Sequence, residues 1–185
     1  MDKKEMIMEA ALRLFNEFGF HGTPTSKIAK EAGVSNGTLF NYFSTKEELI
    51  NTLYLEHITG CRDCVFKELN KDLSVKETMK YLWANAIRWH LKRPEMFKFM
   101  EQFAHSPYIN NIGKEKKEEL FRFAHGLVDK GISHGMFRYK NTKLICCCME
   151  GALSHTTRYL LENENEDMDD VIEESFNMLW QGIGL

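Results

Sequence analysis

Apolar residues recur every three or four positions along most of this chain, which is the pattern of amphipathic α-helices. The first such segment places its apolar residues on one stripe: Ile7, Ala10, Ala11, Leu14, Phe15 and Phe18. No stretch alternates apolar and polar residues over a useful length, so no β-strand is predicted. The pattern therefore predicts an all-α chain of about nine helices, at residues 3–18, 24–31, 35–42, 46–70, 74–92, 94–105, 114–134, 141–162 and 168–181.

Two short predicted helices lie on either side of Gly33 and have helix-turn-helix spacing. Thr23 is expected to cap the first of them, and Pro24 supplies the fixed φ favoured at a first helical position. Gly33 accepts the positive φ of a sharp helix stop, and Ser35 is expected to cap the second helix. Residues 35–38 are small and polar, so this helix can approach a nucleic acid closely, and a recognition helix enters the major groove by its N-terminal end.

The sequence around this motif resembles the TetR family of one-component transcriptional regulators. The resemblance rests on three runs with their spacing kept: ALxLFxxxGF at 11–20, IAxxAGVS at 28–35 and GTLFxYFxxKEEL at 37–49. It covers roughly residues 5–55, whereas residues 56–185 resemble the family in all-helical architecture alone. The resemblance implies a DNA-binding domain at 1–46 and a ligand-binding and dimerisation domain at 47–185. It also implies a homodimeric repressor that a hydrophobic small molecule releases from a palindromic double-stranded DNA operator.

The resemblance further implies which residues contact DNA. Phosphate contacts are expected from Thr25, Ser35, Tyr42 and Lys46, and base contacts from Asn36, Gly37, Phe40 and Asn41. The chemistry agrees in part, because Asn41 can pair with adenine, Phe40 can touch a thymine methyl and Gly37 has no side chain to hinder approach. The alternative for Phe40 is packing in the core.

The net charge of −3 does not favour DNA binding. In the first 55 residues six lysines and arginines face seven acidic residues, whereas a phosphate-dominated interface needs clustered positive charge. We therefore expect modest non-specific affinity for DNA. Two alternatives are a chain of this fold that has lost DNA binding and a helical interaction module that never binds DNA.

Bulky, adaptable side chains concentrate between residues 75 and 127 and suit an apolar ligand cavity. The candidate ligand-binding residues are Trp83, Phe97, Met100, Phe103 and Phe121. Aromatic residues at helical spacing also make ordinary hydrophobic cores, which is the alternative interpretation.

A different regulator would sense metal ions or thiol oxidation through His57, Cys61 and Cys64, which follow one another at i, i+4 and i+7 on a predicted helix. A closed zinc site needs a fourth ligand, and cysteines are also good small core residues. No metal or other cofactor is predicted. Five cysteines, three of them consecutive, argue against a secreted disulfide framework and for the cytoplasm.

The last two predicted helices offer a dimer surface in which two helices from each subunit form a four-helix bundle. The candidate interface residues are Leu144, Gly151, His155, Tyr159, Ile172, Phe176, Leu179 and Trp180. The alternative is that these residues are buried within one subunit.

Catalytic motifs are missing from the sequence. It has no nucleophile elbow, no glycine-rich phosphate loop and no HExxH, so the chain is not expected to be an enzyme. It also has no apolar run of the roughly 18 residues that a membrane span needs, so no membrane helix is expected.

Overall fold

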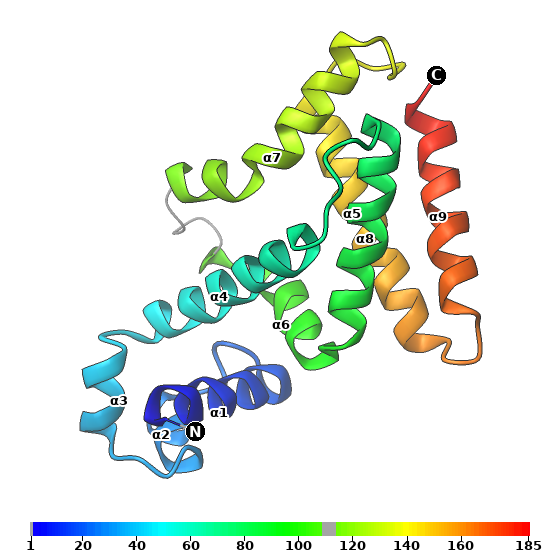
Figure 1. The fold of residues 1–185 in the computed structure, drawn as a ribbon. Coiled ribbons are helices and arrows are strands. Elements are labelled where there is room, and N and C mark those ends of the chain that lie inside the picture. Colours follow the sequence, from blue (N-terminus) through cyan, green and yellow to red (C-terminus); the bar gives the residue numbers. More distant parts are fainter. Residues whose placement is uncertain (1, 109–113) are drawn as a thin grey trace. The chain divides into compact units, whose positions relative to one another are not determined.

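A computed structural model describes residues 2–108 and 114–185, with the backbone alone for residues 114–118 and 120. Its described residues form nine helices (Figure 1). The helices are α1 (Lys3–Phe18), α2 (Thr25–Glu31), α3 (Asn36–Tyr42), α4 (Lys46–Phe66), α5 (Val75–Leu91), α6 (Pro94–Ala104), α7 (Lys114–Ser133), α8 (Thr142–Glu162) and α9 (Met168–Ile183). The predicted all-α fold is confirmed, and the largest difference is that α4 ends at Phe66 rather than at residue 70.

The chain divides into two compact units that are interleaved in sequence. Unit 1 contains Met1–Gly60 and Arg93–Lys114, and unit 2 contains Cys61–Lys92 and Glu115–Leu185. Helix α6 therefore belongs to the same unit as α1, α2 and α3. This structural division differs from the boundary expected at residue 46, because α6 packs against α1. The functional division at residue 46 stays a prediction.

Aromatic rings from α6 complete the core of unit 1. Phe99 of α6 packs edge-on against Phe20, with 5.6 Å between ring centroids, and Phe103 stacks on Tyr54 of α4 at 4.3 Å. Both α6 rings are fully buried. The Asn16 amide of α1 adds a polar link, because its Nδ2 donates to the backbone oxygen of Glu95 at 2.7 Å and to the Glu95 carboxylate at 2.8 Å. These contacts make α6 part of the helix-turn-helix unit.

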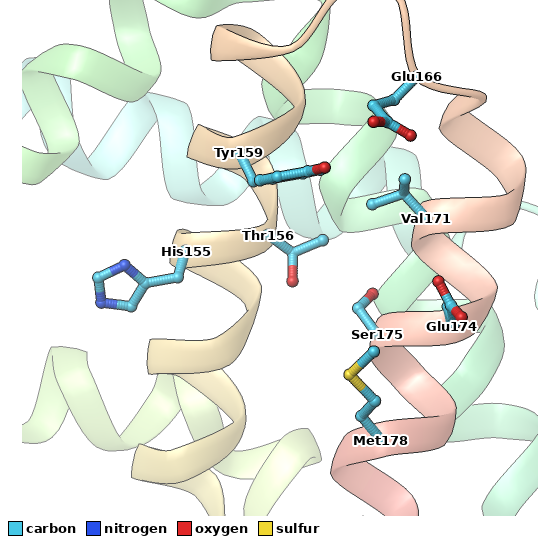
Figure 2. Close-up of a pocket in the computed structure, with 8 residues that line it drawn as sticks. All are labelled: His155, Thr156, Tyr159, Glu166, Val171, Glu174, Ser175 and Met178. Carbon is cyan, nitrogen blue, oxygen red and sulfur yellow. The ribbon is translucent and has the colours of Figure 1, made fainter.

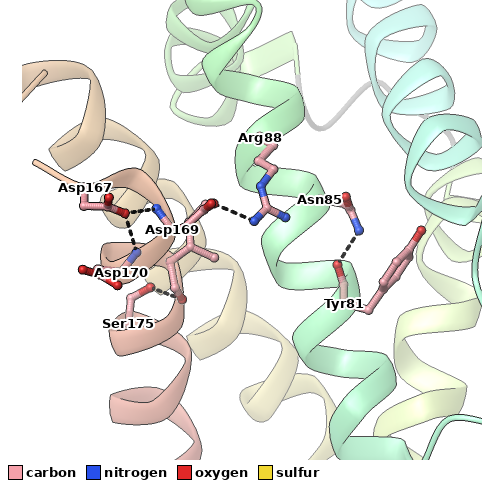
Figure 3. A network of polar contacts seen from close by, with 8 residues as sticks. Tyr81, Asn85, Arg88, Asp167, Asp169, Asp170 and Ser175 are labelled. Carbon is pink, nitrogen blue, oxygen red and sulfur yellow. Dashed lines mark hydrogen bonds and ion pairs between the residues drawn. The ribbon is translucent and has the colours of Figure 1, made fainter.

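Unit 2 is built around rings that α5 and α9 bury together. Trp83 of α5 lies edge-on to Phe176 of α9, which stacks on Trp180. The indole Nε1 of Trp83 donates to the Ser175 hydroxyl at 3.3 Å. At the solvent edge of this contact an ion pair joins Arg88 to Asp169, with 2.7 Å between Nη2 and Oδ1 (Figure 3). Helix α9 is thus held to α5 by apolar packing and by polar contacts.

The start of α9 is fixed by its own acidic segment. The Asp167 carboxylate accepts from the backbone N–H groups of Asp169 and Asp170 at 2.9 and 3.0 Å (Figure 3). A side-chain cap of this kind satisfies N–H groups that have no partner within the helix. The acidic stretch 162–170 therefore ends in an ordered helix start.

Close packing at Gly131 leaves no room for a side chain. A Cβ atom placed there would lie 2.4 Å from Cε2 of Phe137, a buried ring that also contacts Trp180. Gly126, on the same helix, has open space at the corresponding place. The end of the chain lies beside this region, since Arg138 N donates to Ile183 O and Leu185 N donates to Met136 O, each at 2.9 Å.

Candidate nucleic-acid interface

The turn between α2 and α3 is set by Gly33. Its φ is +66°, a conformation that glycine adopts without strain. Val34 N donates to Ala29 O and Gly33 N donates to Lys30 O, which is the hydrogen-bond pair of a Schellman stop. The predicted role of Gly33 is confirmed, and this stop directs the chain into α3.

Thr23 does not cap α2, so that prediction is wrong. The residue before the helix is Pro24, which makes no side-chain cap. Thr23 is instead fully buried, and its hydroxyl lies 3.0 Å from Leu14 O and 2.8 Å from Gly19 O. It therefore ties the end of α1 to the start of the motif, a long-range role that a local capping pattern does not reveal.

Helix α3 has one buried side and one exposed side. The Ser35 hydroxyl caps it by accepting from Thr38 N at 3.1 Å, as predicted. Leu39 is fully buried in the core of unit 1, and Phe43, which follows the helix, is 2% exposed. Because these two side chains anchor the helix from one side, its other positions face solvent.

Six of the eight residues predicted to contact DNA are exposed. Phe40 is 47% exposed and Tyr42 is 44% exposed, so Phe40 is not a core residue. The six exposed residues are Ser35, Asn36, Gly37, Phe40, Asn41 and Tyr42. Thr25 and Lys46 are half-buried, at the starts of α2 and α4. A Cβ atom at Gly37 would meet Ser35 Oγ at 3.8 Å, an ordinary contact, so the free protein does not itself require glycine there.

The start of α4 is held by a reciprocal cap that positions Lys46. Thr45 Oγ1 accepts from Glu48 N at 3.0 Å, and the Glu48 carboxylate accepts from Ser44 N at 2.8 Å and from Ser44 Oγ at 2.6 Å. The hydrogen bonds from Ser44 hold the pKa of Glu48 below its ordinary value. Partial burial lowers the pKa of Lys46, since it disfavours the charged ammonium.

Two other cations of this unit, Lys27 and Arg13, have partners within the protein. Lys27 lies over the Phe18 ring, with its Nζ 3.1 Å from the ring centroid, and Arg13 pairs with Glu31 at 3.0 Å. An exposed pair of this kind is weak and is available for exchange with phosphate. The balanced charge of this unit fits the expectation of modest non-specific affinity.

The residues predicted to bind a ligand lie in separate parts of the fold. Trp83 belongs to the core of unit 2, and Phe103 is buried in the core of unit 1 with Met100 packed against it. Phe97 is buried in α6, and Phe121 is half-buried in α7. Core packing thus accounts for Trp83 and Phe103, and the set as a ligand site stays a prediction.

Three of the residues predicted at the dimer surface are core residues, which corrects that part of the prediction. Ile172, Phe176 and Trp180 are at most 8% exposed and pack within unit 2, because α9 turns its apolar stripe toward α5 and α8. Leu179 is half-buried against the same core. The other four lie on the outer side of α8: Leu144, Gly151, His155 and Tyr159 are exposed.

Sequence reasoning missed Met178, which is 65% exposed on α9 beside a cleft between α8 and α9. The cleft has a volume of about 390 Å³ and is lined by His155, Thr156, Tyr159, Glu166, Val171, Glu174, Ser175 and Met178. Tyr159 extends from α8 toward α9, whereas His155 points away from it (Figure 2). Met178 lies outside the apolar stripe of α9 that Ile172, Phe176 and Trp180 form. That off-stripe position is the sequence signal that could have identified Met178 as an exposed apolar residue.

The metal- or thiol-sensing alternative finds no support. His57 is buried, Cys61 is half-buried and Cys64 is exposed. Within residues 2–108 and 114–185, no group of three His, Cys, Asp or Glu side chains is arranged to hold a metal ion. Across the same residues, no helix is both long and apolar enough to cross a membrane.

Comparison with known proteins identifies both parts of the chain. Residues 7–53 match the model for bacterial regulatory proteins of the tetR family, and residues 54–185 match the tetracyclin repressor-like C-terminal domain. YhgD, an HTH-type transcriptional regulator of Bacillus subtilis (strain 168), is 39% identical over 140 residues, which are 75% of this chain and 73% of that protein. The fatty acid metabolism regulator protein of the same organism is 34% identical over 88 residues, or 48% of this chain and 43% of that protein.

Solved structures share the whole fold. A tetR family structure from Shewanella sp. PV-4 has a TM-score of 0.90 and 28% identity over 100% of both chains. FadR from Bacillus subtilis, in complex with stearoyl-CoA, has a TM-score of 0.80 over 97% of this chain and 98% of that one. At 21% identity, the second likeness concerns the fold alone. Proteins of this kind regulate transcription and are not enzymes, so the non-enzyme prediction is confirmed. The exposed α3 face, the domain matches and the shared fold together make this chain a member of the TetR family of transcriptional regulators.

Proposed function

We propose that this regulator is a cytoplasmic repressor that binds a palindromic operator through α3. The observation that carries the proposal is the two-sided nature of this helix. Leu39 and Phe43 anchor it, while Asn36, Phe40 and Asn41 stand free on the other side. The exposed aromatic ring and the two exposed amides do not serve the core, and they have the chemistry to contact base edges.

Each surface residue has a proposed role that follows from its chemistry. Asn41 donates to and accepts from one adenine, and Phe40 packs on a thymine methyl group. Gly37 lets the helix backbone approach the groove, since no side chain stands there. Lys46 is held at the first position of α4 by the reciprocal cap, where its ammonium pairs with a phosphate.

A single α3 helix spans only a few base pairs, so specific binding requires two copies. A dimer places two recognition helices in successive major-groove faces of a palindrome. We assign the dimer contact to the exposed side of α8, where Leu144 is 54% exposed and Tyr159 is 44% exposed. Large exposed apolar side chains of this kind, gathered on one face, mark protein interaction surfaces.

The proposed effector is a hydrophobic small molecule, and a long-chain acyl thioester is the first to test. Two comparisons support this class, because one match is a fatty acid metabolism regulator protein of Bacillus subtilis and a structure of FadR from Bacillus subtilis was solved with stearoyl-CoA. The Met- and Phe-rich α6 of this chain is compatible with an apolar effector, since flexible thioether and aromatic side chains adapt to such ligands. Met96 and Met100 lie at the edge of the unit 1 core, where they are only partly buried.

Helix α6 couples effector binding to the DNA-binding surface, because it packs directly against the helices that support α3. Its Phe99 and Phe103 rings interlock with the core that α1 and α4 share, and Asn16 binds Glu95 through two hydrogen bonds. An effector that displaces α6 therefore also displaces α1 and the start of α4. When the two recognition helices of the dimer move in this way, the distance between them no longer matches the spacing of the two operator half-sites.

The test uses DNA from immediately upstream of the gene itself. Fluorescence anisotropy of the labelled duplex, with and without stearoyl-CoA, gives the coupling between the two ligands. A coupling free energy of about 1–3 kcal/mol lowers DNA affinity roughly 5- to 150-fold, and DNA must weaken acyl thioester binding by the same factor. Operator binding that the acyl thioester does not change would refute this effector class, and failure to prefer the upstream DNA over random DNA would refute specific binding.

A further inference from the structure

Phe18, the last residue of α1, does not join the core that the rest of its apolar stripe builds. It is 42% exposed, whereas Leu14 and Phe15 of the same stripe are at most 5% exposed. The ring of Phe18 instead contacts the ammonium of Lys27, with 3.1 Å between Nζ and the ring centroid. This distance lies well within the range in which an aromatic face attracts a cation. The ring therefore holds a charged side chain of α2, and neither residue is among the DNA contacts predicted from the sequence.

The connection between α1 and α2 fixes the place of this ring. Gly19 turns the chain with a φ of +69°, and Gly22 then packs so closely that a Cβ atom there would lie 2.3 Å from the backbone oxygen of Phe18. The buried Thr23 hydroxyl lies 2.8 Å from the backbone oxygen of Gly19. Because the loop packs on itself in this way, Phe18 keeps a fixed place beside the first turn of α2, which carries Lys27.

Lys27 keeps its positive charge available to a further partner. Among the residues that the structure describes, no carboxylate pairs with it. An aromatic ring attracts a cation without neutralising it. Two other cations of unit 1 are already paired with carboxylates, Lys4 with Glu56 at 2.7 Å and Arg13 with Glu31 at 3.0 Å. Lys27 can therefore bind an anion without first losing an acidic partner.

The place of α2 in the motif gives this lysine an anion to bind. In a helix-turn-helix, the first helix crosses the DNA backbone while the second helix reads the bases. Lys27 is exposed on the first of these helices, two positions after Thr25, which is itself predicted to contact a phosphate. A lysine side chain loses rotamer freedom when an interface immobilises it, and a side chain that is already ordered loses less.

We propose that Lys27 contacts a phosphate of the DNA backbone and that Phe18 is the positioning residue that holds its ammonium ready for this contact. The proposal rests on the proposed DNA binding through α3 and adds a contact outside that helix. A phosphate contact carries no sequence information, so it strengthens binding to operator and random DNA alike. Ordering one long side chain before binding changes affinity roughly 2- to 10-fold.

The salt dependence of DNA binding tests the phosphate contact. Fluorescence anisotropy gives the affinity for the upstream duplex and for a scrambled duplex between about 50 and 200 mM salt. Lys27→Gln should reduce the slope of log affinity against log salt by about one on both duplexes, because one phosphate fewer is neutralised. Lys27→Arg keeps the charge and should keep the slope. Lys98→Gln is the matched control that should leave the slope unchanged, because Lys98 is exposed on α6 of the same unit and loses the same charge.

Energetic coupling between the two residues tests the positioning role. Phe18→Leu keeps an apolar side chain and removes the aromatic face, so it should weaken binding to both duplexes roughly 2- to 10-fold. In the Lys27→Gln background the same substitution should have no effect, because no ammonium is left to position. A merely structural role for Phe18 would weaken binding in both backgrounds. Circular dichroism checks that each variant folds, and Phe18→Met repeats the comparison with a second apolar side chain.

The outcomes separate this inference from the proposed function. A wild-type chain that binds neither duplex would overturn both. Operator binding whose salt slope is lowered no more by Lys27→Gln than by Lys98→Gln would overturn the phosphate contact and leave the proposed function standing. A Phe18→Leu protein that binds DNA at least as tightly as the wild type would overturn the positioning role, because the ring would then be idle or would compete with the phosphate. Equal weakening by Phe18→Leu with and without Lys27 would do the same.

Discussion

Replacing Asn41 and Leu39 by alanine, one at a time, should separate DNA recognition from folding. The two residues lie two positions apart on a seven-residue helix. Asn41 is exposed and Leu39 is fully buried. Asn41→Ala removes a surface amide, so the free energy of unfolding should change by no more than about 0.5 kcal/mol. Leu39→Ala empties part of a packed core and should cost about 2–5 kcal/mol.

The specificity of DNA binding should show the opposite pattern, with a large effect of Asn41→Ala and none of Leu39→Ala. Loss of one bidentate contact with adenine costs about 1–3 kcal/mol, or roughly 5- to 150-fold in affinity for the operator, and leaves random DNA nearly unaffected. Leu39→Ala should lower the fraction of folded protein while the ratio of specific to non-specific affinity of the folded protein stays the same. Urea unfolding gives the first quantity, and anisotropy with operator and scrambled duplexes at one salt concentration gives the second.

Either of two results would refute this assignment of the faces of α3. One is an Asn41→Ala protein that loses affinity equally for operator and scrambled DNA, because a base contact must discriminate between sequences. The other is a Leu39→Ala protein whose stability is unchanged, since the helix would then not be anchored by that side chain. Circular dichroism at the temperature of the binding assay ensures that each affinity refers to folded protein.

Three further expectations concern charge, packing and thiol chemistry. Lys46→Ala should weaken specific and random DNA alike and reduce the salt slope by about one, and an unchanged slope would place Lys46 away from phosphate. Gly131→Ala should lower the free energy of unfolding by about 1–3 kcal/mol because the added methyl meets a buried ring at 2.4 Å, whereas Gly126→Ala should leave it equal or raise it by up to about 1 kcal/mol; equal urea midpoints would contradict this. Burial raises the pKa of Cys146 to about 11, so its thiolate is scarce at pH 8, and iodoacetamide followed by peptide mapping should label the exposed Cys64 well before Cys146.

Local signals in the sequence were sufficient for the helices and for the turn. Helix ends depend on neighbouring residues, so the cap at Ser35 and the stop at Gly33 were readable from residue type and spacing. The exposed face of α3 followed from the same reasoning, since a short helix with buried Leu39 has only one side left for solvent. Thr23 was misassigned because its hydroxyl bonds the backbone oxygens of Leu14, which lies on α1, and of Gly19, which follows α1. No local capping pattern specifies these contacts.

Partners of the apolar stripes could not be predicted in the same way. Periodicity shows that Phe103, Trp83 and Phe176 each lie on an apolar face, but it does not show which helix covers that face. In the structure Phe103 stacks on Tyr54, and Trp83 meets Phe176. An apolar stripe can cover a ligand, contact a partner subunit or form part of the subunit's own core. Tertiary packing decides which of these occurs, and the periodicity of the sequence does not reveal it.

Interleaving of the two units has a consequence for how the protein is made. During synthesis, α1 to α3 and the first part of α4 emerge together, but Phe99 and Phe103 follow only after residues 61–92. At about 5–20 residues per second, the ribosome needs roughly 2–9 s to travel from Gly60 to Ala104. Throughout that interval the apolar surface around Phe15 and Phe20 lacks its cover. Transiently exposed apolar surface favours aggregation, so we expect a fragment that stops after α4 to be less soluble than one that includes α6.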